Sequence, residues 1–188
     1  WVQSMTTTNT FDAEATLAQI HRLEEAGCEI VRVTVPKKED VEGVKAIRDR
    51  IKIPLIADIH YDYRMALACL EARTPSGKRA VDKIRINPGN IGGEERFKEV
   101  VRKARDAGVP MRIGVNSGSL EKDLIEKYGF PCPEAMVESA LRYIETAESL
   151  GYNQMIVSLK ASHVPTAVEC YTQYAGKSDY PTHVGITE

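Results

Sequence analysis

Short runs of apolar and β-branched residues alternate with longer segments of helical periodicity along the whole chain. In the longer segments the apolar residues recur at i, i+3 and i+4, as at Leu17, Ile20 and Leu23. We predict strands at residues 2–6, 30–35, 55–59, 83–87, 111–116, 155–160 and 183–187. We predict helices at residues 13–26, 40–50, 63–71, 94–107, 133–150 and 164–175. This alternation is typical of βα units arranged around a parallel sheet.

The two faces of five predicted strands differ in character. One parity is apolar, as in Val31, Val33 and Val35. The opposite parity is mostly polar and comprises Arg32, Thr34, Asp58, His60, Arg85, Asn87, Arg112, Gly114, Asn116, Ser158 and Lys160. A doubly wound sheet covers both faces with helices and leaves such groups hard to satisfy, whereas a barrel turns one face toward its lumen. We therefore predict an α/β fold of the (β/α)8 TIM-barrel type, with about seven βα units in residues 1–188.

Composition narrows the class of protein. The chain has 188 residues, of which 43% are hydrophobic and 28% charged, which suits one well-cored domain and excludes a disordered chain. A net charge of −2 with both signs interspersed argues against nucleic acid or a membrane as a partner. No apolar run approaches the roughly 20 residues that span a bilayer, and no signal peptide opens the sequence, so we expect a cytoplasmic protein. Both ends fall on predicted strands, and we expect a piece of a longer polypeptide.

Four cationic side chains are predicted to gather at the carboxyl ends of the strands: Arg32, Arg85, Arg112 and Lys160. Only Asp58 and Glu188 are expected nearby as anions. Crowded cations repel one another unless an anion is brought in, and the arginine fork matches phosphate oxygens. The pattern therefore predicts a phosphorylated or diphosphorylated ligand. The alternative interpretation is that these arginines pair with carboxylates as structural layers inside the barrel.

Three further features of this end are suited to chemistry. Asp58 and His60 share a face and fit either an orienting pair, as in acid–base sites and around metals, or a structural histidine. Lys160 fits phosphate binding, which its arginine companions favour, or a Schiff base formed by a desolvated amine. The glycine-rich loop 87–93 offers backbone amides to a phosphate, and the long connection after residue 116 begins beside it.

Six segments of the chain together resemble one family. They are residues 2–6 (VQSMT), 57–60 (ADIH), 85–92 (RINPGNIG), 112–122 (RIGVNSGSLEK), 157–162 (VSLKAS) and 185–188 (GITE). The same segments occur in this order in the 4-hydroxy-3-methylbut-2-enyl diphosphate synthases, and the resemblance spans essentially the whole chain. The sequence is on this basis similar to the N-terminal barrel portion of that family, and residues 1–188 are expected to form an incomplete TIM-barrel substrate-binding domain.

The resemblance implies an activity. Members of the family are oxidoreductases of the methylerythritol phosphate pathway of isoprenoid biosynthesis. They reduce 2-C-methyl-D-erythritol 2,4-cyclodiphosphate by two electrons, opening the ring and losing water to give (E)-4-hydroxy-3-methylbut-2-enyl diphosphate. Ferredoxin or flavodoxin supplies the electrons, a 4Fe-4S cluster sits in a separate C-terminal domain, and the enzyme is a homodimer. The resemblance therefore implies that residues 1–188 alone are inactive.

The resemblance also implies roles for single residues. The diphosphate would be held by Arg85, Arg112 and Lys160, with Asn87 and Asn116 beside them, and the substrate would be positioned by Asp58 and His60. Glu188 would be the catalytic acid–base group at the departing hydroxyl. Arg32 joins the substrate-binding set from the face pattern and not from the resemblance.

Three features depart from the family's pattern. The cluster domain is absent, so none of the cysteines is expected to be a cluster ligand, and their spacing fits neither a zinc site nor a disulfide framework: Cys28, Cys69, Cys132 and Cys170. The last barrel unit is absent, which is expected to leave an open sheet edge. Segment 72–80 is longer than usual and is predicted to be a surface loop. Glu188 shares the outward parity of Val184 and Ile186, so its role requires a turn after Thr187.

Two alternative functions stay open at this point. One is a cluster-free barrel of the Schiff-base aldolase type, in which Lys160 is the nucleophile and is trapped by borohydride. The other is a phosphoanion-binding module without chemistry, whose affinity for diphosphate is indifferent to Glu188→Gln.

Overall fold

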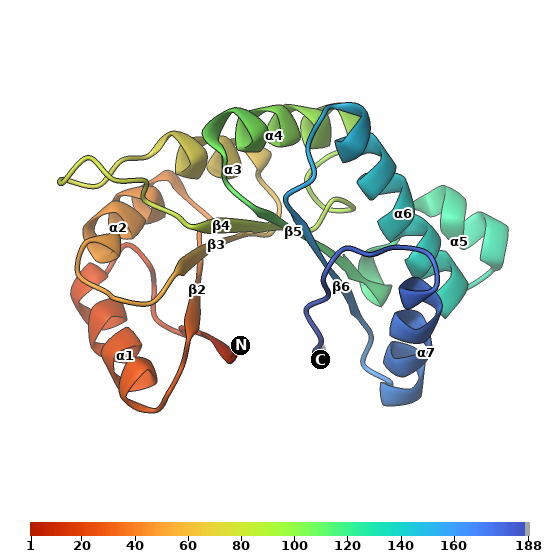
Figure 1. The fold of residues 1–188 in the computed structure, drawn as a ribbon, viewed down its shortest axis with the longest axis horizontal. Coiled ribbons are helices and arrows are strands. Elements are labelled where there is room, and N and C mark those ends of the chain that lie inside the picture. The colour runs from red at the N-terminus through yellow and green to blue at the C-terminus, as the bar shows by residue number, and fades with distance from the viewer. Residues whose placement is uncertain (187–188) are drawn as a thin grey trace.

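Six parallel strands form one curled sheet in the computed structural model, which describes residues 1–186 (Figure 1). The strands lie side by side in chain order: β1 (Gln3–Met5), β2 (Ile30–Thr34), β3 (Leu55–Ile59), β4 (Lys83–Ile86), β5 (Met111–Asn116) and β6 (Met155–Lys160). Three strands have the predicted bounds, and β1, β2 and β4 are one or two residues shorter. A doubly wound sheet reverses its strand order partway, whereas this order runs in one direction around a curve. The prediction of a partial TIM-type barrel is confirmed.

Helices cover the convex face of the sheet and leave the concave face open (Figure 1). All six predicted helices are confirmed to within two residues at each end: α1 (Ala13–Glu25), α2 (Lys38–Arg48), α3 (Tyr63–Glu71), α4 (Glu94–Ala107), α6 (Pro133–Ser149) and α7 (Val164–Ala175). The structure adds a 3-10 turn η1 (Ser117–Ser119) and a short helix α5 (Lys122–Tyr128) in the long connection after β5. Helix α5 spans about two turns, too few to show a clear apolar period.

Strand register places the polar parity on the concave face. The apolar parity lies under the helices, where Val31, Val33 and Leu55 are fully buried. On the other parity Asp58 pairs with Arg85 on the neighbouring strand, and Arg85 pairs in turn with Arg112. One carboxylate and two guanidinium groups therefore form a row across β3, β4 and β5. The separation of faces that the sequence predicted is confirmed, and we call the concave side the lumen.

The prediction of a seventh strand at residues 183–187 is wrong over the described residues, because residues 183–186 do not form a regular strand. The segment meets β6 at one parallel bridge, between Val157 and Thr182. Val157 N–H donates to Pro181 O (2.9 Å), and His183 N–H donates to Val157 O (2.8 Å). Within residues 1–186 no strand pairs with the outer side of this segment, and one bridge is too few bonds to form a ladder. Thr187 and Glu188 lie outside the described residues.

Segment 72–80 is largely exposed, as predicted for a surface loop. An isolated antiparallel bridge joins Arg73 to Arg79 at its base. Its tip is tied to the end of α2, because the amide and hydroxyl groups of Ser76 donate to the Asp49 carboxylate at 3.0 and 2.7 Å. The loop is therefore ordered at its base and tip by its own polar contacts.

Candidate functional site

Asp58 is the anion around which the lumen cations gather. Its side chain, on β3, is 2% exposed, and Oδ1 accepts a hydrogen bond from Arg85 Nη1 at 3.0 Å. Its other oxygen, Oδ2, lies 3.2 Å from both Arg32 Nε and His60 Nε2. Burial alone would raise the pKa of Asp58, but His60, Arg85 and Arg32 together lower it well below its usual range. The carboxylate therefore stays ionised and fixes three side chains from β2, β4 and the end of β3.

Arg112 is a buried cation that lacks a matching anion. Its side chain on β5 is 0% exposed, and its one hydrogen bond within residues 1–186 runs from Nη1 to Ser158 Oγ at a long 3.4 Å. Nε and Nη2 have no partner in that part of the chain. Burial, reinforced by Arg32 and Arg85, lowers the pKa of Arg112 to about 9. Such an unpaired buried guanidinium is costly, and an anion beside it would offset that cost.

Lys160 adds a further positive charge at the carboxyl end of β6. Its half-buried ammonium lies beside the segment that follows Thr182, because a Cβ built on Gly185 would be 3.3 Å from Lys160 Nζ. Burial, with Arg112 and the other lumen arginines, lowers the pKa of Lys160 to about 8. At pH 7 the amine remains charged. The lumen cations Arg32, Arg85, Arg112 and Lys160 therefore face the carboxylate of Asp58.

Asn87 and Asn116 lie where β4 and β5 end. Asn87 is buried, and its amide group joins two loops: Nδ2 donates to Ser119 Oγ at 2.7 Å, and Oδ1 accepts from Gly89 N–H at 3.2 Å. A Cβ on Gly89 would lie 2.2 Å from Ser119 O, so the two loops touch closely. Asn116 Oδ1 is buried without a partner in the described residues. Asn87 thus holds the shape of this end, and Asn116 retains an unused acceptor.

The predicted site residues fall into three groups. Direct contacts bring together Arg32, Asp58, His60 and Arg85. Arg112 and Lys160 belong with them, because the charges of Arg32, Arg85 and Asp58 act on the pKa of both. Asn87 and Asn116 border this cluster at the strand ends. The proposed catalytic residue, Glu188, lies outside the described residues.

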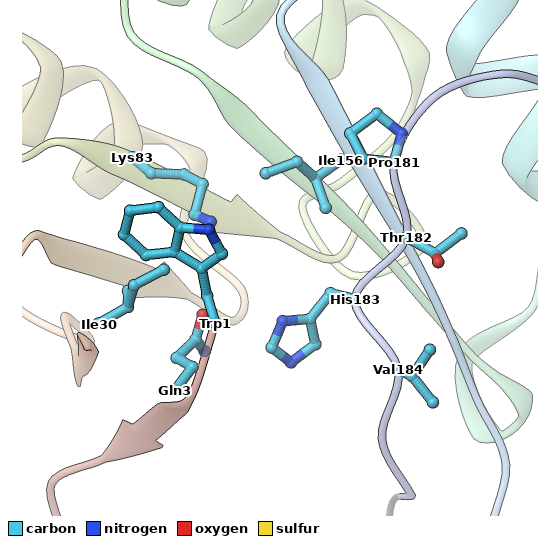
Figure 2. A pocket seen from close by; sticks show the side chains of 9 residues that line it. All are labelled: Trp1, Gln3, Ile30, Lys83, Ile156, Pro181, Thr182, His183 and Val184. Atoms are coloured by element: carbon cyan, nitrogen blue, oxygen red, sulfur yellow. The ribbon is translucent and has the colours of Figure 1, made fainter. Parts of the chain in front are cut away.

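Two lumen residues were missed by the sequence reasoning, namely Lys83 and His183. Both line a cavity of about 610 Å³ near the amino ends of the strands, where the ring of His183 points across the space (Figure 2). Tyr171 Oη fixes the segment by donating to His183 O at 2.7 Å. Burial, with Arg112 and Lys160, lowers the pKa of His183 to about 3, so the imidazole is neutral at pH 7. The alternation of outward Val184 and Ile186 already implied that His183 and Gly185 face inward.

The described residues do not converge on a metal site. Across residues 1–186 no three His, Cys, Asp or Glu side chains approach closely enough to hold an ion. The four cysteines are each buried and free. In the same part of the chain no helix has the length and apolar character needed to span a membrane.

Comparisons with known proteins agree with this geometry. Residues 1–188 match the family described as the GcpE TIM-barrel domain. The chain is 57% identical over 187 residues to 4-hydroxy-3-methylbut-2-en-1-yl diphosphate synthase (flavodoxin) of Geobacillus kaustophilus, covering 100% of this chain and 48% of that protein. It is 54% identical to the protein of the same name from Listeria monocytogenes, with 100% and 49% covered. The chain therefore spans about half the length of these curated relatives, whose names do not favour the aldolase-type or non-catalytic alternatives.

Solved structures support the fold alone. A type I 3-dehydroquinate dehydratase from Clostridium difficile superposes with a TM-score of 0.71 at 16% identity, covering 99% of this chain and 74% of that one. A phospho-2-dehydro-3-deoxyheptonate aldolase from Thermotoga maritima gives 0.67 at 12% identity, covering 97% and 50%. With a parallel curled sheet, a polar lumen and a family match over its whole length, this chain belongs to the GcpE TIM-barrel domain family.

Proposed function

We propose that the chain is the substrate-binding barrel of a 4-hydroxy-3-methylbut-2-enyl diphosphate synthase. The reaction takes the cyclic diphosphate and two electrons, breaks the ring C–O bond to the phosphate, and expels one hydroxyl as water. The observation that carries the proposal is Arg112, a fully buried guanidinium with two unpartnered nitrogens among residues 1–186. A cyclic diphosphate is a dianion at neutral pH, because each phosphorus keeps one ionised oxygen, and it supplies the charge that the lumen lacks.

In this proposal the lumen residues make different contacts with the diphosphate. The positive charges of Arg112 and Lys160 are the least balanced by a neighbouring carboxylate, and these two side chains would contact the diphosphate directly. Arg85 contributes a guanidinium that Asp58 already orients, and Asn116 adds an amide at the strand end. Charge-assisted hydrogen bonds of this kind contribute about 1.5–3 kcal/mol each. The diphosphate would thereby be held at the carboxyl ends of the strands, with the carbon skeleton toward the open mouth.

Asp58, His60 and Arg32 would act together on orientation. Asp58 Oδ2 lies 3.2 Å from His60 Nε2, which fixes the ring while leaving the rest of this half-exposed side chain toward the mouth. A positioned imidazole there is suited to hydrogen bonding a substrate hydroxyl. In the proposal Glu188 delivers the proton that converts the departing hydroxyl to water.

The reducing equivalents come from elsewhere. The residues present do not fit a 4Fe-4S cluster, since the four cysteines are separately buried and none of them joins a metal-binding group within residues 1–186. We therefore assign the cluster to a separate C-terminal domain and no electron-transfer step to this chain. The names of the relatives support flavodoxin as the donor, with ferredoxin as its counterpart. The proposal sets the reaction in the cytoplasm, in a homodimeric enzyme.

Calorimetric titration with 2-C-methyl-D-erythritol 2,4-cyclodiphosphate tests the proposal. We expect saturable binding by the chain and a loss of about 10- to 100-fold in affinity in Arg112→Ala, as for one charge-assisted hydrogen bond. Arg102→Ala is the control, because Arg102 is exposed on α4, outside the lumen. Circular dichroism verifies that each variant is folded. A folded chain that does not bind the cyclic diphosphate, or an Arg112→Ala variant that binds it as tightly, contradicts the proposed function.

A further inference from the structure

Gly114 is a glycine in the middle of a buried strand, where glycine is unfavourable. It lies on the lumen face of β5 between Arg112 and Asn116, and every residue of this strand except Asn116 is buried. Glycine inside a strand lowers stability, and it often marks a place where another group approaches the backbone closely. The backbone of Gly114 is not in the left-handed region, so its conformation does not demand glycine. The reason must lie in the space above its Cα atom.

The space above Gly114 is filled by the guanidinium of Arg85. A Cβ atom at position 114 would lie 2.7 Å from Arg85 Nε, 3.0 Å from Nη2 and 3.2 Å from Cζ. The first of these distances is shorter than real Cβ contacts allow. Arg85 thus lies flat across β5 while its Nη1 donates to Asp58 on β3 at 3.0 Å. One guanidinium therefore spans three strands, and the missing side chain of Gly114 makes that pose possible.

Arg85 has little freedom to move away from an added methyl group. Its side chain is 9% exposed, and displacement would break the bond to Asp58, leaving that buried carboxylate with Arg32 and His60 only. Arg85 also lies beside Arg112 in the register, so a shift toward β5's amino end would bring two guanidinium groups together. The added methyl group therefore acts on the guanidinium and not on the fold of β5.

We propose that Gly114 is a positioning residue, which holds open the slot that sets the Arg85 guanidinium for anion binding. The inference rests on the proposed function, because the anion that Arg85 meets is the diphosphate of that proposal. It adds a specific requirement: position 114 tolerates no side chain as long as residue 85 is arginine.

A double-mutant cycle on urea unfolding tests the slot without any ligand. Gly114→Ala is expected to lower the folding equilibrium constant about fivefold to tenfold in the wild-type background. In an Arg85→Ala background the methyl group meets an empty slot, and the same change should be neutral or stabilising, because alanine restricts the unfolded chain. Arg85→Lys, which keeps the positive charge, provides a second background if Arg85→Ala does not fold. Gly118→Ala is the matched control, since its Cβ would meet nothing within 4 Å.

Calorimetric titration with the cyclic diphosphate then tests the consequence for binding. Gly114→Ala should weaken binding about tenfold, whereas Gly118→Ala should bind within twofold of the wild type. An equal cost of Gly114→Ala in both backgrounds, or wild-type affinity in Gly114→Ala, overturns the inference. If the wild type itself does not bind the ligand while unfolding shows the coupling, the slot stands and the proposed function fails.

Discussion

Replacing Arg112 with methionine should stabilise the unliganded protein while it weakens diphosphate binding about 10- to 100-fold. Arg112 is fully buried, Nε and Nη2 have no partner in residues 1–186, and the neighbouring Arg32 and Arg85 repel it. Exchanging a buried charge for an apolar side chain of similar length is worth about 1–4 kcal/mol in folding free energy. The loss of the long bond to Ser158 Oγ returns about 1 kcal/mol of that gain. We expect a net stabilisation of up to about 3 kcal/mol at pH 7.

Urea unfolding followed by circular dichroism measures this change. With a denaturant slope of about 2–3 kcal/mol/M, the midpoint of Arg112→Met should rise by up to about 1.5 M with an unchanged slope. The exposed Arg102→Met should stay within about 0.5 kcal/mol of the wild type. A variant destabilised by about 1 kcal/mol or more would show that the guanidinium is satisfied in the free protein, and would refute the reasoning.

Three further predictions concern the groups around Arg112. Asp58→Asn should cost about 3–5 kcal/mol of folding free energy in urea unfolding, because it leaves Arg32 and Arg85 without their buried anion; no loss would mean that water already screens them. Affinity for the cyclic diphosphate should fall as pH rises through about 8, where Lys160 loses its proton, and Lys160→Arg should hold its affinity up to pH 9 in calorimetry. The pKa of His183 is lowered to about 3, so protons bind the unfolded chain preferentially below about 6.5 and stability should fall with acidification toward pH 3; His183→Gln should flatten this slope in urea midpoints measured from pH 7 to 4.

The fold could be predicted from sequence to a large degree because its signals are local. Helix α4, with Glu94 and Glu95 in its first turn and Gly108 just beyond its end, contains its own start and stop signals, and its bounds agree with the prediction. The apolar and polar parities of β2 to β6 likewise depend on neighbours two residues apart. The segment at 183–187 failed for a non-local reason: strand propensity alone cannot form a ladder, and only one bridge to Val157 is present in the described residues.

The sequence predicted which residues belong to the site, but not which of them contact one another. The parity of the strand positions identified Arg32, Asp58, Arg85 and Arg112 as lumen residues. The strand register, however, decides which of these side chains lie next to each other. The relative shift of neighbouring strands sets Asp58 opposite Arg85 and Arg85 opposite Arg112, and that shift depends on the loops between them. Sequence could not indicate that Asp58 contacts Arg32 and Arg85 and leaves Arg112 without a carboxylate partner among residues 1–186. His183 could not be assigned to the lumen from sequence, because it lies in a segment that makes only one bridge to β6 and whose path depends on contacts with distant residues such as Tyr171.

The distribution of charge explains why a chain with a net charge of −2 suits an anionic ligand. Surface ion pairs such as Lys98 with Glu94 and Glu95 are screened and add little to stability or to the field inside the barrel. In the lumen the cations Arg32, Lys83, Arg85, Arg112 and Lys160 lie on the same side of the sheet as the carboxylate of Asp58, and burial, reinforced by the positive charge of Arg112, lowers the pKa of Lys160 and His183. A bound dianion would offset the contribution of the positive charges and would thereby raise both pKa values. Ligand binding and the protonation of the lumen must therefore be coupled, and binding of the cyclic diphosphate near pH 8 should draw protons from solution, which calorimetry in buffers of different ionisation enthalpy measures directly.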